Sequence, residues 1–346
     1  MKSDTQILKK ISLQRSLVLR IGRYVVTALL VTYVLHKTGL FTAQGWHDLF
    51  FTFAQARIPY LLGSIGVGIL VTLSSTIKWY MLLRSQGLMV TFWRLFAYYI
   101  IGKFFNLVLP TSLGGDVVRM YQLGQYTERR ADAAASVFVE RFTGLITLVL
   151  LTLVAVVINL HLFNLSWLTF ALIVATGGMI LVSWLIIDKR LVELVRRLFG
   201  KRIQPLGSLL DKITTFHDAV LAYKDDPVAL LIAFVNSLIF HLLAVVNVWI
   251  SARALGLDLS LLDLMAAVPI ILFIMNLPIS IGGIGLMEFA YSFILGIYGA
   301  TPTLAISTGL LMRAKSFVYA AVGGLLYALV SDGYFSGTES ALDGQV

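Results

Sequence analysis

The sequence predicts an all-α polytopic membrane protein built as an inverted repeat. Composition gives the first reason, because 58% of the 346 residues are hydrophobic and 13% are charged, which is about half the charged fraction of soluble domains. Hydropathy gives the second, because several apolar runs approach the ~20 residues that a helix needs to cross the hydrocarbon core. The third reason is a polar motif that interrupts apolar sequence once in each half of the chain.

Six apolar runs are predicted to cross the membrane as helices. They span residues 24–41, 60–83, 131–158, 167–187, 228–250 and 303–330. Residues 46–56 mix aromatic and charged side chains, and we expect them to lie along the outer interface.

The connecting segments set the orientation, because Lys and Arg concentrate in cytoplasmic loops. Residues 1–23 are a basic lead-in, and residues 188–226 are a basic insert with leucines spaced as in amphipathic surface helices. Both are therefore expected in the cytoplasm. Residues 331–346 are predicted to be a flexible polar tail on the same side.

Two further stretches, residues 96–123 and 264–299, carry helix breakers inside apolar sequence. A straight crossing at the first stretch would leave Arg119, Arg129 and Arg130 outside the cell, against the charge rule. A re-entrant helical hairpin returns them to the inside, and such a turn is permitted where other helices shield its backbone. We therefore expect two re-entrant hairpins.

The two hairpins define two halves of opposite orientation. The first opens inward and the second outward, so residues 24–158 and 167–330 each hold about three crossing helices and one hairpin. If both stretches crossed the membrane instead, the chain would have eight spans and a weaker symmetry.

Both hairpins contain the pattern P-x-S-x-G-G, with an Asn before it and an acid after it. Interrupted helices in corresponding halves are the best sequence indication of a transporter's binding site, whereas two ordinary loops with common turn residues are the alternative. The first copy comprises Asn106, Pro110, Ser112, Gly114, Gly115 and Asp116, and the second comprises Asn276, Pro278, Ser280, Gly282, Gly283 and Glu288.

Charged residues at membrane depth are costly, at ~2.5–3.5 kcal/mol each, and indicate a pathway. We expect Arg119, Arg141 and Arg313 to line a polar slot for a phosphate-bearing lipid headgroup, because a guanidinium binds two oxygens at once. The N–H groups that follow each Gly-Gly turn would add to it. Three acids, Asp116, Glu140 and Glu288, would hold the arginines or bind protons.

The alternative is that these charges pair with one another and only fix helix packing. For Lys103 and Lys315 both roles stay open, since lysines can extend to the interface. Lys78 and His241 are predicted to be structural.

Several other function classes are excluded or disfavoured. The chain has no cysteine, which excludes disulfides, thiol catalysis and thiolate metal sites. No motif for metal, phosphate-loop or serine-hydrolase chemistry is present, so we expect neither enzyme activity nor a cofactor. The net charge of +9 is concentrated beside apolar segments, which indicates cytoplasmic loops and not a nucleic-acid partner. The charges at membrane depth are mixed in sign, which disfavours a channel.

Three segments resemble the lysylphosphatidylglycerol synthase transmembrane-region family of flippase-like proteins, which includes the membrane half of the multiple peptide resistance factors. A weaker match surrounds Arg313, and Glu140 stands where the family often has Asp. The segments are Leu109–Tyr121, Ser136–Leu145 and Leu277–Glu288.

The resemblance implies a transporter that moves a lipid between the leaflets of a prokaryotic cytoplasmic (inner) membrane. The lipid would be anionic or headgroup-modified, either a phospholipid or linked to polyprenyl phosphate. The chain offers no polar stretch long enough for the aminoacyl-transferase domain of the resistance factors. A scaffold or accessory subunit for a separate lipid-modifying or glycosyl-transfer enzyme is the alternative, and homo-oligomerisation stays open.

Overall fold

The structure is a computed structural model that describes residues 22, 24–109, 114–158, 166–187, 204–277, 279–280 and 282–334. Within these ranges the chain is entirely helical, with turns and no strand. The lead-in 1–23 apart from Gly22, most of the tail 331–346 and the first part of the insert 188–226 lie outside them.

The first half begins with the apolar helix Tyr24–Lys37. It continues through α2 (Ala43–Ala54), α3 (Ile58–Ser85), α4 (Phe92–Val108), α5 (Gly114–Thr127) and α6 (Arg130–Ile158). The second half comprises α7 (Ser166–Ile187), α9 (Gln204–Leu221), the 3-10 turn η2 (Ala222–Asp225), α10 (Pro227–Ala254), α11 (Leu261–Met275), α12 (Leu286–Ile297) and α13 (Pro302–Tyr334).

Four helices are long and apolar enough to cross a membrane: α3, α6, α10 and the Pro302–Leu329 part of α13. They confirm the helices expected at four of the six predicted crossings, and the other two crossings fall on Tyr24–Lys37 and α7. Both α3 and α10 have a proline in their first turn. A backbone N–H at this position has no acceptor within the helix, so proline loses no hydrogen bond there, and its fixed φ suits the helix. The chain is an integral multi-pass membrane protein.

The two interrupted elements are each a pair of short helices. The first breaks between α4 and α5, and the second breaks between α11 and α12. In the second break Gly282, Gly283 and Gly285 have φ of 58°, 72° and 76°, a left-handed backbone that glycine adopts without steric cost. In the first, a Cβ on Gly115 would clash with the carbonyl oxygen of Gly102, so glycine permits α4 and α5 to pack closely.

The helices of the two halves pack in matching pairs. In the first half α3 contacts α4 and α6, α4 contacts α5, and α5 contacts α6; in the second half α10 contacts α11 and α13, α11 contacts α12, and α12 contacts α13. The two halves also contact each other: α13 packs on α4, α6 packs on α11, and α3 packs on α10.

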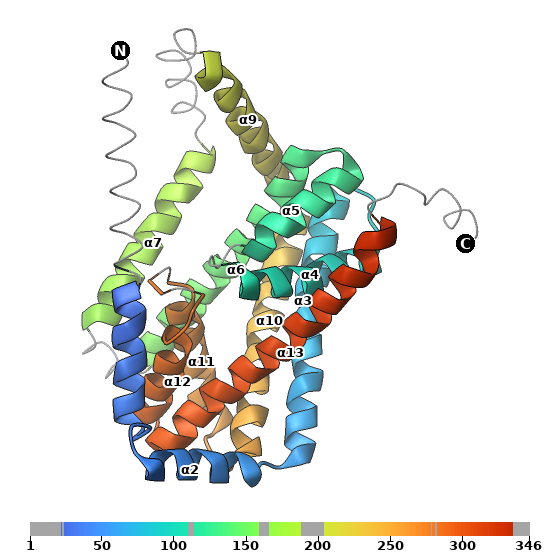
Figure 1. The fold of residues 1–346 in the computed structure, drawn as a ribbon. Helices are drawn as coiled ribbons and strands as arrows, with labels where there is room; N and C mark the ends of the chain where they lie inside the picture. Colours follow the sequence, from blue (N-terminus) through green and yellow to red (C-terminus); the bar gives the residue numbers. More distant parts are fainter. Residues whose placement is uncertain are drawn as a thin grey trace, which may run out of the picture.

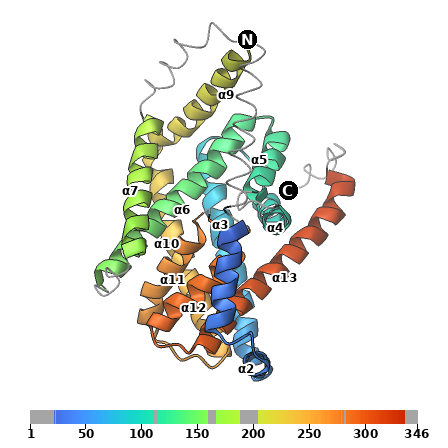
Figure 2. The ribbon, with the colours of Figure 1, turned by 60° about the vertical axis from the view of Figure 1, so that its left-hand side comes forward.

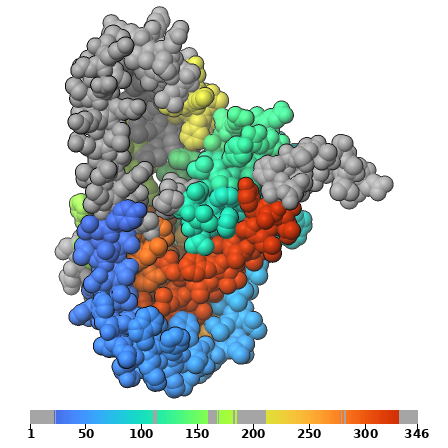
Figure 3. Space-filling view, viewed as in Figure 1, coloured from blue at the N-terminus to red at the C-terminus, as the bar shows by residue number. Residues whose placement is uncertain are grey.

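The two short-helix pairs lie toward opposite ends of the molecule. In both ribbon views α5 is in the upper part and α4 is just below it near mid-height, whereas α11 and α12 lie in the lower part (Figures 1 and 2). Helix α13 runs diagonally between these levels across one face (Figure 3). Helix α2, which covers most of the predicted interfacial segment, lies across the lower end (Figure 1).

Candidate functional site

The predicted charges of the first half form one buried ionic cluster. Arg119 and Arg141 each donate to the same oxygen, Oδ1 of Asp116, at 2.7 Å. Arg119 Nη1 lies 3.0 Å from Glu140 Oε2, and Lys78 Nζ lies 3.9 Å from Glu140 Oε1. We call these five residues the first cluster. It joins α3, α5 and α6 by charge.

Arg119 is enclosed on every side. Its residue exposure is 1%, and its guanidinium lies over the rings of Tyr99 and Trp79, at 4.2 and 4.9 Å from their centroids. The face of an aromatic ring attracts a cation, and the attraction is stronger when the cation is removed from water. Tyr99 in turn donates its hydroxyl to Glu140 at 3.2 Å. Arg119 therefore cannot reach a ligand in this conformation, whereas the side chain of Arg141 is 44% exposed.

Lys78 and His241 make contacts that link helices. Lys78 Nζ donates to the carbonyl oxygen of Glu140 at 2.8 Å and to Ser237 at 3.1 Å. The Nε2 atom of His241 lies 3.3 Å from the carbonyl oxygen of Gly144. These contacts connect α3, α6 and α10, as the structural interpretation of both residues predicts.

The second half has a smaller ionic pair. Arg313 of α13 donates from Nε and Nη2 to the two carboxylate oxygens of Glu288, with the Nη2 contact at 3.0 Å. Its Nη2 also donates to the carbonyl oxygen of Gly283 at 2.8 Å, and Glu288 accepts the Gly285 N–H at 3.0 Å. The pair thus binds the glycine turn to α13.

The two ionic sites occupy corresponding positions in the halves. Arg141 follows Asp116 by 25 residues, and Arg313 follows Glu288 by 25 residues. In each case the acid lies on the second short helix and the arginine on the next long helix. This spacing is visible in the sequence, and our sequence reasoning missed it.

A central cavity of about 410 Å³ lies between the halves. Of the predicted site residues, Asn106 comes from the first half, and Gly282, Gly283 and Arg313 come from the second. The other polar side chains that line it are Lys103, Asn247, Tyr291, Lys315, Ser316 and Tyr319.

The remaining predicted residues lie elsewhere. Asp116, Arg119, Glu140 and Arg141 belong to the first cluster, so the structure does not bring the three arginines into one slot. Gly114 and Gly115 are buried at the start of α5, and Glu288 contacts the cavity only through Arg313. Ser280 is buried, Asn276 caps α11 and donates to Leu272 of its own helix, and Ser112 lies outside the described residues.

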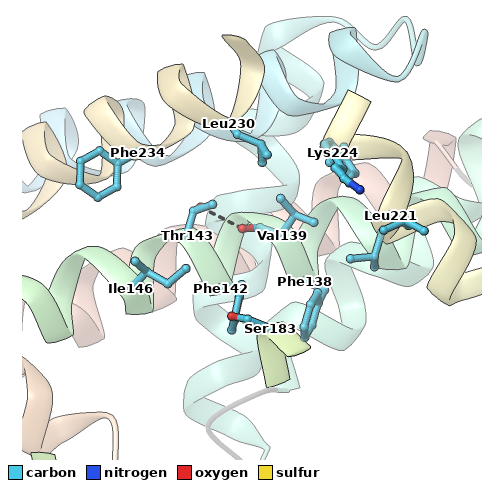
Figure 4. Close-up of a pocket in the computed structure, with 12 residues that line it drawn as sticks. Phe138, Val139, Phe142, Thr143, Ile146, Ser183, Leu221, Lys224, Leu230 and Phe234 are labelled. Atoms are coloured by element: carbon cyan, nitrogen blue, oxygen red, sulfur yellow. Dashed lines mark hydrogen bonds between the residues drawn. The ribbon is translucent and has the colours of Figure 1, made fainter. Parts of the chain in front are cut away.

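A second cavity, of about 430 Å³, has a different character. Figure 4 shows that its wall consists mainly of apolar side chains, among them Phe138, Phe142 and Ile146 from α6 and Leu230 and Phe234 from α10. Lys224 is the one lysine or arginine among the residues that line it. This cavity suits hydrocarbon and offers little to a polar headgroup. Within the described part of the chain, no group of His, Asp and Glu side chains could hold a metal ion.

Comparisons with known proteins agree on one family. The family model for the lysylphosphatidylglycerol synthase TM region matches residues 20–323. A UPF0104 membrane protein of Methanothermobacter thermautotrophicus is 21% identical over 279 residues, which cover 76% of this chain and 82% of the relative. No solved structure matches. Since the family model spans more than half of the chain, this protein belongs to the lysylphosphatidylglycerol synthase transmembrane-region family.

Proposed function

We propose that this protein moves a lipid with an anionic headgroup between the two leaflets of a membrane, and that the headgroup occupies the central cavity. The observation that carries the proposal is the composition of the cavity wall. Residues of the two interrupted elements, Asn106 from one and Gly282 and Gly283 from the other, border the same space as Arg313 and two lysines. Transporter sites are commonly built where interrupted helices of two repeats meet.

The pattern of helix contacts supports an inverted repeat. Suppose that α3, α4, α5 and α6 exchange places, in that order, with α10, α11, α12 and α13. Each helix contact within one half then becomes a helix contact within the other half, and the contact of α13 with α4 becomes the contact of α6 with α11. The 25-residue spacing of acid and arginine follows the same exchange. A transporter could use such a pair of halves to expose one cavity to each side in turn.

The lengths of the short helices support re-entrant hairpins. Helices α4, α5, α11 and α12 have 17, 14, 15 and 12 residues. At ~1.5 Å per residue each is shorter than the ~30 Å hydrocarbon core. A chain that turns back inside the membrane needs shielding of its broken backbone, and the crossing helices α13 and α6 pack on α4 and α11.

The charges of the cavity suit a phosphate. Arg313 is held at the cavity wall by Glu288, whose two carboxylate oxygens accept from Nε and Nη2. This leaves Nη1 to donate to a phosphate oxygen in a charge-assisted hydrogen bond. A polar path for the headgroup would allow the lipid tails to stay in hydrocarbon during the transfer. We place this activity in the cytoplasmic membrane of a prokaryote, with both termini inside, because the basic residues concentrate in 1–23 and 188–226.

Transport can be measured on the full chain in liposomes. Acyl chains labelled with a fluorophore report their leaflet, because dithionite reduces only the label that it reaches from outside. We expect vesicles with protein to lose the inner-leaflet signal of an anionic phospholipid. Arg313→Ala should slow this loss, and Arg253→Ala is the matched control, because Arg253 pairs with Asp258 at an exposed site away from the cavity. Equal rates in Arg313→Ala and wild type would contradict the assignment of the site. Intact signal with every lipid would favour the scaffold or accessory-subunit alternative.

Topology can be measured separately, since the chain has no cysteine of its own. Val117 at the start of α5 and Ile284 in the second break are both exposed. With Val117→Cys and Ile284→Cys, an impermeant maleimide applied to intact cells should label only the second. Labelling of both from the same side would contradict the opposed hairpins.

A further inference from the structure

The charged side chains at membrane depth differ in whether a carboxylate accompanies them. Each cation of the first cluster contacts Asp116 or Glu140, and Arg313 contacts Glu288. Lys103 and Lys315 are different, because neither forms an ion pair with any described carboxylate. A charge at this depth without a partner is costly, so its presence calls for an explanation.

The partners of both lysines are neutral. Lys103 Nζ donates to the hydroxyl of Thr72 at 2.6 Å and lies 4.8 Å from the ring centroid of Tyr319. Lys315, which is 5% exposed, donates to Asn247 at 2.7 Å and to Ser251 at 2.7 Å. An ammonium has three N–H donors. The contacts with described residues therefore leave two donors on Lys103 and one on Lys315.

Both lysines face the same central cavity from different halves of the chain. Lys103 belongs to α4 of the first half, and Lys315 belongs to α13, two residues after Arg313. Among the described residues that line the cavity, none is Asp or Glu. With Arg313 balanced by Glu288, the wall carries two positive charges that nothing in the described structure balances.

The cavity also limits the size of the headgroup. Its volume of about 410 Å³ is near the lower end of the ~300–1,000 Å³ range of ligand sites. A phosphate or diphosphate suits this space, whereas a lipid-linked glycan chain would exceed it.

We propose that Lys103 and Lys315 form the phosphate-binding site of the cavity, and that its substrate is a lipid whose small headgroup carries two negative charges, a terminal phosphate or diphosphate. This inference rests on the proposed function and narrows it. A phosphodiester lipid with one negative charge balances one lysine only. An aminoacylated lipid brings further ammonium groups against Lys103, Arg313 and Lys315 and is disfavoured.

Binding to the detergent-purified full chain tests the proposal without relying on transport. A fluorescent phosphatidic acid in mixed micelles is displaced by unlabelled lipids, and fluorescence anisotropy gives their affinities. We expect phosphatidic acid and a polyprenyl phosphate to bind about tenfold more tightly than phosphatidylglycerol, with lysyl-phosphatidylglycerol weakest. The ratio of the first two affinities distinguishes a diacyl tail from a prenyl tail.

Charge variants separate binding from folding. The double change Lys103→Gln with Lys315→Gln should remove the preference for phosphatidic acid while phosphatidylglycerol binding stays near its original value. Lys103→Arg with Lys315→Arg keeps both charges and should retain the preference. Lys224→Gln, at the apolar second cavity, is the matched control and should bind as wild type.

Two results would overturn the inference: equal affinity of the wild type for phosphatidic acid and phosphatidylglycerol, or an unchanged preference in the double Gln variant. These failures differ from failure of the proposed function. Transport of phosphatidylglycerol without any preference for two charges would refute the lysine site alone. Selective binding of phosphatidic acid without transport would refute lipid translocation alone.

Discussion

The first cluster and the central cavity use the same types of charged side chain in opposite ways. In the cluster two carboxylates, of Asp116 and Glu140, contact three cations, and only the side chain of Arg141 is substantially exposed. At the cavity wall only one of three cations, Arg313, contacts a described carboxylate, that of Glu288. Charges that neutralise one another in the interior fix the positions of helices, whereas unbalanced charges at a cavity wall attract a ligand of the opposite sign.

The comparison also separates residues that sequence alone treats alike. Arg119 and Arg313 are both arginines within apolar sequence, at the depth of the membrane. Arg119 is covered by two aromatic rings and is 1% exposed, but Arg313 lies at the wall of a cavity. Protein therefore encloses the first arginine, whereas the second lies where the headgroup of the proposed substrate would reach it.

The largest expected effect is loss of stability when the first cluster is broken. Glu140→Gln removes the carboxylate that faces Arg119 and Lys78, and leaving a buried charge unpaired costs about 3–5 kcal/mol. The midpoint of thermal unfolding in detergent, followed by fluorescence, should fall sharply. Asp258→Asn is the control, because the exposed pair with Arg253 contributes only about 0–1 kcal/mol. An unchanged midpoint together with lost transport would assign Glu140 to function instead.

A smaller loss is expected where α4 and α5 pack closely. The Cβ of Gly115→Ala would overlap the carbonyl oxygen of Gly102, and such overpacking costs about 1–3 kcal/mol. Gly66→Ala on α3 is the matched control, since no atom lies within 4 Å of its added Cβ. We expect the unfolding midpoint to fall for the first variant and to stay or rise for the second. Equal midpoints would mean that the two helices separate more easily than their contacts indicate.

The two corresponding arginines should differ in their effects. Arg313→Lys keeps a charge but loses the paired contact with Glu288 and the contact with Gly283, so we expect transport to fall by about tenfold. Arg141→Lys leaves Asp116 with its contact to Arg119, and we expect a change below about threefold under the same rule. The initial rate at which dithionite removes the inner-leaflet fluorescence of liposomes measures the effect of both variants. A larger effect at Arg141 would reverse the comparison and move the binding site toward the first cluster.

The interrupted elements could be predicted from sequence because proline and paired glycines are poor helix interiors. In the structure α4 and α5 are separate helices, with Gly114 and Gly115 beginning α5, and α11 and α12 are separated by a break that contains Gly282 and Gly283. The family could be predicted for the same reason, since two of its three matching segments lie at these breaks. Pairing across helices could not be predicted. Whether Arg119 faces Glu140 depends on the rotation of α5 against α6, and packing with neighbouring helices sets that rotation.

Sequence also left Lys103 and Lys315 undecided. A lysine in an apolar helix can extend toward the interface, and its periodicity does not tell whether the side chain faces lipid, protein or a cavity. Their common position at one cavity depends on α13 packing on α4, a contact between residues more than two hundred positions apart. Reasoning from local patterns contains no information on such a contact.

The smallest expected effect compares the two asparagines that precede the motifs. Asn106 accepts the N–H of Gly115 at 2.7 Å, across the break, so it caps α5, and Asn106→Ala should cost about 1 kcal/mol. The side chain of Asn276 donates to the carbonyl oxygen of Leu272 within its own helix, and Asn276→Ala should change the unfolding midpoint less.

Transport by the same two variants gives a sharper test, because the halves of an inverted repeat exchange roles when the cavity opens to the other side of the membrane. If Asn276→Ala slows transport while leaving the midpoint unchanged, its side chain acts in the other orientation, where it would cap α12 as Asn106 caps α5 here. If neither variant affects transport, the asparagines are helix caps without a share in the movement.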